Sequence, residues 1–142
     1  VRATEFDAQL ITQGEQVIRA KAAEFERKGN TITAKEKGLL TILEVALEMM
    51  LRGMVFHRVD IYRSHATKFL IADGGLLPPL ASLQGLGESA ANSIVQAREG
   101  YTFSSLEDFR NRSRVSKTVI DILKEHGCLT DLPETDQTVL FA

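Results

Sequence analysis

The sequence predicts a mainly α-helical protein with a short β element in its first half. Two long stretches, residues 5–28 and 33–52, place apolar residues at helical spacing. A run of alternating apolar and polar residues follows them and predicts the β element. The second half repeats a pattern of helix, tight turn and helix, so we expect a separate C-terminal helical domain there.

Composition limits the class of protein. The chain has 142 residues, 44% hydrophobic and 25% charged, which is typical of a globular protein with one core or two small ones. No segment approaches the roughly 20 apolar residues of a membrane-spanning helix, and the first residues lack a secretory pattern, so we expect a cytoplasmic protein. Val1 stands where an initiator methionine is expected, which favours a chain cut from a longer one. The net charge of −2 argues against binding of nucleic acid by bulk positive charge, so any DNA contact must be local.

The first half is expected to contain two helices. Residues 5–28 form an amphipathic pattern that Gly14 weakens and can split. The second helix begins at Thr33, which forms a predicted capping box with Glu36, and it ends at Gly53. Leucine, isoleucine and methionine side chains give this second helix a wide apolar face.

The β element is expected between residues 54 and 71. Val55, His57, Val59 and Ile61 alternate with Phe56, Arg58 and Asp60, which predicts a short strand, and a second strand is expected at 68–71. A turn follows at residues 73–75, and the two prolines at 78–79 favour a domain border.

Residues 80–94 contain the first hairpin pattern. Gly85 and Gly87 can adopt positive φ, and Leu86 between them is expected to point inward and hold the turn. The N–H groups of the turn and of the next helix would then face outward, where they can bind a phosphate. This arrangement matches the helix-hairpin-helix motif, which binds DNA backbone without reading bases. A glycine turn that only packs two helices is the alternative, and Glu88 would compete with a phosphate.

A second copy appears after a shift of 29 residues, from Leu77 to Leu106. The apolar positions are retained, but Arg114 and Ser116 replace the two glycines. We therefore expect this hairpin to bind phosphate through side chains rather than backbone amides. The candidates are Arg112, Arg114, Ser116 and Lys117, within a run from residue 110 to 117 that has four cationic residues and no acid.

The tail, residues 131–142, has a polar stretch followed by apolar residues on a segment too short to form a core. Gln137, Leu140 and Phe141 match the pattern Gln-x-x-Leu-Phe, which resembles the bacterial sliding-clamp binding peptide. The alternative is that the tail folds back onto the helical domain. Cys128 and the three histidines lack zinc spacing, so we expect a reduced, partly buried thiol and no metal site.

Together these residues resemble the PolC-type alpha subunit of DNA polymerase III, over nearly the whole chain. The most specific matching pieces are Lys35-Glu36-Lys37, residues 48–53, Val59-Asp60-Ile61-Tyr62-Arg63-Ser64, Leu77-Pro78-Pro79, Gly85-Leu86-Gly87-Glu88, residues 115–120 and Leu140-Phe141. The resemblance implies three parts: residues 1–76 as the end of the polymerase fingers, 77–130 as a tandem helix-hairpin-helix domain that binds duplex DNA, and 131–142 as a clamp-binding tail.

The resemblance also implies roles and partners. Tyr62, Arg63 and Ser64 become candidates for contact with nucleotide or template. The implied partners are primer–template duplex DNA, the sliding clamp and the rest of the polymerase chain, with no membrane. The clamp peptide departs from the usual pattern at Thr138, where a leucine is more common, and Ala142 adds a residue after the expected end.

The expected function is that of the C-terminal part of a bacterial replicative DNA-directed DNA polymerase. Its aspartates are scattered rather than paired, so this segment is expected to contain no catalytic residues, no metal and no cofactor, and Mg²⁺ is expected in the palm of the parent polymerase. One alternative is a freestanding helix-hairpin-helix DNA-binding accessory protein. Another is a structural helical domain whose hairpins contact only protein.

Overall fold

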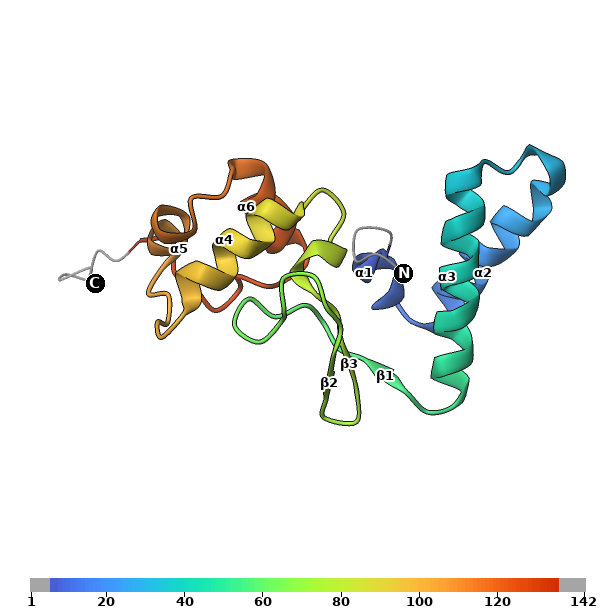
Figure 1. Ribbon diagram of the computed structural model, residues 1–142, viewed down its shortest axis with the longest axis horizontal. Coiled ribbons are helices and arrows are strands. Elements are labelled where there is room, and N and C mark those ends of the chain that lie inside the picture. The colour runs from blue at the N-terminus through green and yellow to red at the C-terminus, as the bar shows by residue number, and fades with distance from the viewer. Residues whose placement is uncertain (1–5, 136–142) are drawn as a thin grey trace, which may run out of the picture.

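The computed structural model describes residues 6–135, and helices dominate this part of the chain (Figure 1). The helices are α1 (Ala8–Ile11), α2 (Glu15–Arg27), α3 (Ala34–Leu51), α4 (Glu88–Arg98), α5 (Leu106–Ser113) and α6 (Lys117–Glu125), with 3₁₀ turns η2 (Gly29–Thr31) and η3 (Leu80–Ser82). The strands are β1 (Val55–Phe56), β2 (Leu70–Ala72) and β3 (Gly75–Leu77). The predicted fold class is therefore confirmed. No helix within the described residues is long and apolar enough to cross a membrane.

The predicted first helix is split into α1 and α2 at Gly14. Gly14 has φ of +102° and is the N-cap of α2, a conformation that glycine adopts without steric cost. Asp7 caps α1 by accepting a hydrogen bond from the N–H of Leu10 at 3.1 Å. Ile11, Ile18 and other apolar side chains of this region are buried, as the periodicity predicted.

The ends of α3 are the ones that the sequence predicted. Thr33 and Glu36 form the capping box. At the other end Gly53, with φ of +85°, donates to the carbonyl of Met50, and Met54 donates to that of Met49, both at 3.0 Å. These two bonds form a Schellman motif. The apolar face is only partly covered, because Val45 stays 53% exposed.

The β element is a small sheet with strand order β1-β3-β2. β1 pairs with β3 in parallel, and β2 and β3 form an antiparallel hairpin around the predicted turn, where Asp73 and Gly74 have positive φ. β1 covers only Val55 and Phe56 and is shorter than the alternation predicted. The chain turns at Asp60, which accepts bonds from the N–H groups of Tyr62 and Arg63. Strand β3 was not predicted.

The buried side chains form one cluster that includes residues from both sides of the predicted border, such as Leu43 and Leu123. Pro78 and Pro79 are themselves fully buried. The division into parts at residues 76 and 130 stays a prediction. In Figure 1 the α2–α3 pair lies at one end of the molecule and helices α4 to α6 at the other, with the sheet between them.

Candidate nucleic-acid interface

The two predicted hairpins follow the same backbone path. The first hairpin consists of η3, residues 85–87 and α4, and the second of α5, residues 114–116 and α6. Gly85 has φ of +90°, and Arg114 at the equivalent position has φ of +57°. Gly87 (φ −75°, ψ 170°) and Ser116 (φ −69°, ψ 163°) match closely.

One expectation is corrected by these angles. Gly87 does not take positive φ; it is an extended N-cap, a conformation open to other residues. The second hairpin also keeps the backbone geometry of the first, because Arg114 adopts the left-handed conformation that glycine adopts in the first copy. The second copy therefore keeps a positive φ at this position but exposes a cationic side chain there in place of a glycine.

The repeated apolar positions form the buried side of both hairpins. Each of the following pairs is buried in both copies: Leu80 and Phe109, Leu86 and Val115, Ala91 and Ile120, Ile94 and Leu123. The hairpins also touch each other, since a Cβ at Gly85 would lie 2.9 Å from Cδ1 of Ile122 in α6. The repeat read from sequence is thus a structural repeat with a shared core.

The first hairpin exposes backbone N–H groups. Gly87 has no side chain to cap α4, and the N–H groups of Glu88, Ser89 and Ala90 have no acceptor among residues 6–135. Gly85 and Gly87 are exposed, whereas Leu86 is buried and its N–H donates to the carbonyl of Leu83 at 3.0 Å. Leu86 therefore holds the turn and presents no surface of its own to DNA. The free N–H groups at the positive end of a helix can bind an anion.

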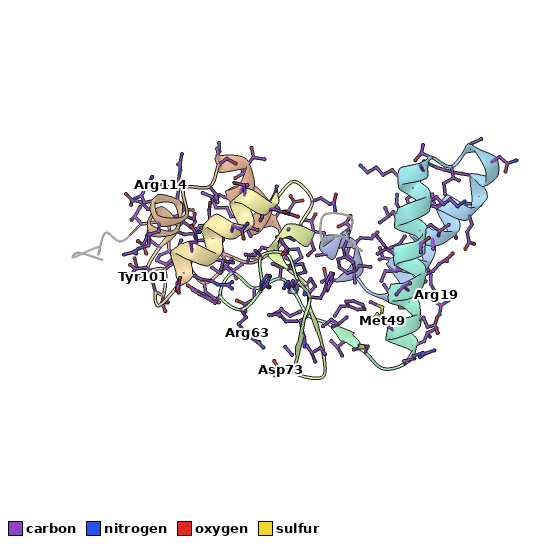
Figure 2. All side chains as sticks on the ribbon, in the orientation of Figure 1. Arg19, Met49, Arg63, Asp73, Tyr101 and Arg114 are labelled. Carbon is purple, nitrogen blue, oxygen red and sulfur yellow. The ribbon has the colours of Figure 1, made fainter. Side chains whose placement is uncertain are left out.

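The second hairpin presents side chains as well. The hydroxyl of Ser116 accepts a hydrogen bond from the N–H of Val119 at 3.2 Å, so one orphan amide of α6 is already capped. Arg114 and Lys117 are exposed, and neither forms an ion pair within the described part of the chain. Arg114 lies at the edge of the helical domain (Figure 2). These two cations stand beside the turn where a phosphate would approach.

Arg112 has partners within the protein. Its guanidinium carbon lies 3.3 Å from the centre of the Tyr101 ring, and its Nε donates to Oδ1 of Asp108 at 3.0 Å. The N–H of Ser104 donates to the same carboxyl, and this bond is the main cause that lowers the pKa of Asp108. Arg112 thus already has an ion pair with Asp108 and a cation–π contact with Tyr101, which distinguishes it from Arg114 and Lys117.

The three residues suggested for nucleotide or template contact differ in accessibility. Tyr62 is 40% exposed and stacks on Phe103, with ring centroids 5.8 Å apart. Arg63 is paired with Asp73 at 3.1 Å on the surface (Figure 2). Ser64 is fully buried, and its Oγ accepts a hydrogen bond from the N–H of Asp60. Ser64 therefore holds the turn of Tyr62 and Arg63 and offers no surface for a ligand.

The chain after α6 returns to the start of α5, so the first residues of the tail fold back onto the helical domain, as the alternative given for the tail describes, although the individual bonds were not predicted. The N–H of Leu106 donates to the carbonyl of Pro133 at 2.8 Å, and that of Glu107 to the carbonyl of Glu134 at 3.2 Å. These carbonyls satisfy first-turn amides of α5 in the way a cap does. Every residue carries such a carbonyl, so the sequence contains no signal for this contact. The predicted clamp residues Gln137, Leu140 and Phe141 lie outside the described residues.

Groups of metal-ligating side chains are absent from residues 6–135, where no three His, Cys, Asp or Glu residues lie close enough to hold an ion. Cys128 is partly buried, and its Sγ donates to the carbonyl of Val59 at 3.3 Å. Burial raises the pKa of this thiol to about 12, so it stays protonated near neutral pH.

Two hairpins with a shared core and outward amides define a helix-hairpin-helix protein. The model of the family described as "Helix-hairpin-helix motif" matches residues 53–139, and the chain belongs to this family. The resemblance to PolC-type polymerases is also confirmed. DNA polymerase III PolC-type of Caldanaerobacter subterraneus subsp. tengcongensis is 59% identical over 141 residues, and those of Clostridium perfringens and Bacillus subtilis are 55% and 48% identical. Each match covers 99% of this chain and 10% of the relative, so the chain is similar to a segment about a tenth of their length.

Proposed function

We propose that this chain is the part of a bacterial PolC-type replicative DNA polymerase that holds duplex DNA and docks on the sliding clamp. Similarity to those polymerases includes the residues before position 53, which the helix-hairpin-helix match does not reach. A freestanding hairpin protein would not need them, so the match favours the polymerase. Nucleotidyl transfer and its Mg²⁺ ions would belong to parts of the parent chain outside these residues. The proposed location is the cytoplasm.

The observation that carries the proposal is the repeat of one turn geometry at residues 85–87 and 114–116. In each turn the first and third residues are exposed and the middle residue is buried. The first turn would bind one phosphate through the N–H groups at the start of α4. The second would bind another through Arg114 and Lys117. Two such contacts would follow the backbone across the minor groove and read no bases.

The direct test is fluorescence anisotropy of labelled duplex DNA with the 142-residue chain, over a salt series from about 50 to 200 mM. Affinity is expected to be the same for unrelated sequences and to fall with salt, with a log–log slope of about −2 to −4 for two to four neutralised phosphates. Absence of binding at the lowest salt would instead support hairpins that contact only protein.

Docking on the clamp is proposed for Gln137, Leu140 and Phe141. The described start of the tail is held beside α5 through the carbonyls of Pro133 and Glu134. Apolar side chains on a short segment, such as Leu140 and Phe141, bind when another surface covers them. Leu140→Ala with Phe141→Ala is expected to abolish retention on an immobilised bacterial sliding clamp and to leave duplex binding intact. Gln137→Ala is expected to weaken retention less. If the double variant is retained like the wild type, the docking site lies elsewhere.

Contact with nucleotide or template is proposed only for Tyr62 and Arg63, whose side chains are exposed. Arg63 would exchange Asp73 for a phosphate, which is feasible because an exposed ion pair contributes little stability. Ser64 would act only by positioning these two residues through its bond to Asp60.

A further inference from the structure

An apolar groove lies between α3 and the sheet, at the opposite end of the molecule from the hairpins. One wall is a stripe on α3 made of Ile42, Val45, Ala46 and Met49, at the spacing i, i+3, i+4 and i+7. The cavity has a volume of about 150 Å³, and apolar side chains alone line it. Figure 2 shows Met49 on the side of α3 that faces the sheet. We call this feature the α3–sheet groove.

The other wall comes from the sheet. Phe56 and Ile71 are both paired with Leu76, and residues directly opposite each other on neighbouring strands share one face. Phe56 and Leu76 line the groove together with Phe69, and Phe6 packs edge-on against Phe69, with ring centroids 4.9 Å apart. The same row therefore continues outward to Ile71, which is 84% exposed.

The α3–sheet groove is open to solvent, although its apolar lining is of the kind that proteins usually bury. α3 also packs on α2, and its Leu43 is fully buried. Val45 lines the groove, Ile71 is paired with the lining residue Leu76, and both are among the most exposed large apolar residues of the described part of the chain. A contiguous apolar surface of this kind indicates an interaction site.

We propose that the α3–sheet groove binds an amphipathic helix of the same polymerase chain, contributed by a part that lies outside these 142 residues. This rests on the proposed function, because the relatives are matched over only 10% of their own length and most of such a chain is available to fill the groove. The i, i+3, i+4, i+7 stripe is the surface that a helix packs against. The purely apolar lining selects apolar partner side chains, since a charge buried here would have no partner. β1, with two residues, is too short to recruit an added strand.

Thiol labelling tests this without disturbing the fold, because the substituted positions are exposed. Val45→Cys and Ile71→Cys are made in the 142-residue chain and in a chimera in which this chain replaces the matched segment of the Caldanaerobacter polymerase. Thr41→Cys, on an exposed position of α3 outside the groove, is the matched control. Cys128 contributes little background, because burial raises its pKa to about 12.

All three thiols are expected to react with maleimide at similar rates in the short chain. In the chimera those at positions 45 and 71 are expected to react at least tenfold more slowly, and the control at an unchanged rate. Equal rates in both proteins would overturn the proposal. So would protection in the short chain that grows with its concentration, which would assign the groove to a second copy. Duplex binding by the same samples is read separately, so a failure of DNA binding and a failure of groove protection are distinguishable.

Discussion

The two hairpins share a backbone and a buried core but differ in what they expose. The first combines bare amides with the acid Glu88, whereas the second combines a capped amide with Arg114 and Lys117. Positive φ is met by glycine at position 85 and by arginine at position 114. The comparison teaches that one turn can be kept while the groups exposed beside it change from backbone N–H groups to cationic side chains, which are the proposed sources of phosphate binding.

This difference predicts that the two hairpins contribute unequally to the proposed DNA affinity. Hydrogen bonds from a cation to a phosphate are roughly twice as strong as those from neutral donors. Each cation that neutralises a phosphate also releases counterions and adds about 0.9 to the salt slope. We therefore expect the second hairpin to supply most of the salt-dependent affinity and the first to fix the position of the backbone.

The largest effect is expected from Arg114→Glu combined with Lys117→Glu. Loss of two phosphate contacts and the added repulsion should weaken duplex binding about 100-fold at about 100 mM salt and reduce the salt slope by about 2. The measurement is the anisotropy titration described above. Lys35→Glu with Lys37→Glu changes the charge equally on an exposed stretch of α3 and is expected to have little effect. An unchanged slope in the first variant would mean that the cations serve only as solvated surface.

Gly85→Ala should show how strongly the first turn depends on glycine. The residue has φ of +90°, and the added Cβ would lie 2.9 Å from Cδ1 of Ile122. We expect the free energy of unfolding to fall by about 2 kcal/mol, from backbone strain and crowding together. Urea unfolding measures this change. Gly87→Ala is the matched control, because its φ is negative and a Cβ there meets nothing, and its cost should stay below about 1 kcal/mol. Equal costs at both positions would contradict the assigned geometry.

Local chemistry made much of the fold predictable. The capping box at Thr33, the glycine end at Gly53 and the break at Gly14 each depend on a few neighbouring residues, and each was found where expected. The apolar positions of the repeat were equally legible, because burial fixes their residue types. These features placed both hairpins before the tertiary structure was known.

The remaining features depend on tertiary context. Arginine is disfavoured at positive φ, so local sequence preferences do not predict the conformation of Arg114. The turn at this residue is kept because Val115 and α6 are packed into the core. Strand β3 has three residues and is defined by its partners on both sides. Ser64 was a candidate for contact with nucleotide or template, yet it is buried in the turn that begins at Asp60. The roles of the candidate DNA and clamp residues stay predictions.

Arg114→Gly separates the two properties that residue 114 combines. Removing the strain of a non-glycine residue in the left-handed conformation should stabilise the folded state by about 1–2 kcal/mol. The extra conformational freedom of glycine in the unfolded chain costs about 0.5–1 kcal/mol. The free energy of unfolding should therefore rise by about 0.5 kcal/mol, while duplex affinity falls about fivefold with the lost charge. Arg114→Lys should keep most of the affinity. A loss of stability in the glycine variant would show that Arg114 makes stabilising contacts that outweigh the strain.

The smallest effect, and the one that tests the first hairpin alone, is expected from Glu88→Gln. Glu88 is exposed in the first turn of α4, where its negative charge interacts favourably with the helix dipole and repels a phosphate. Its neutralisation should tighten duplex binding about threefold and lower the free energy of unfolding by about 0.5 kcal/mol, both within the range of one charge at a helix terminus. Glu99→Gln, at the other end of α4, removes the same charge away from the turn and should leave duplex affinity nearly unchanged. Affinity and stability are expected to change in opposite directions only at position 88. Equal gains in affinity from Glu88→Gln and Glu99→Gln would instead indicate a general charge effect. The amides of the first hairpin would then have no demonstrated part in DNA binding.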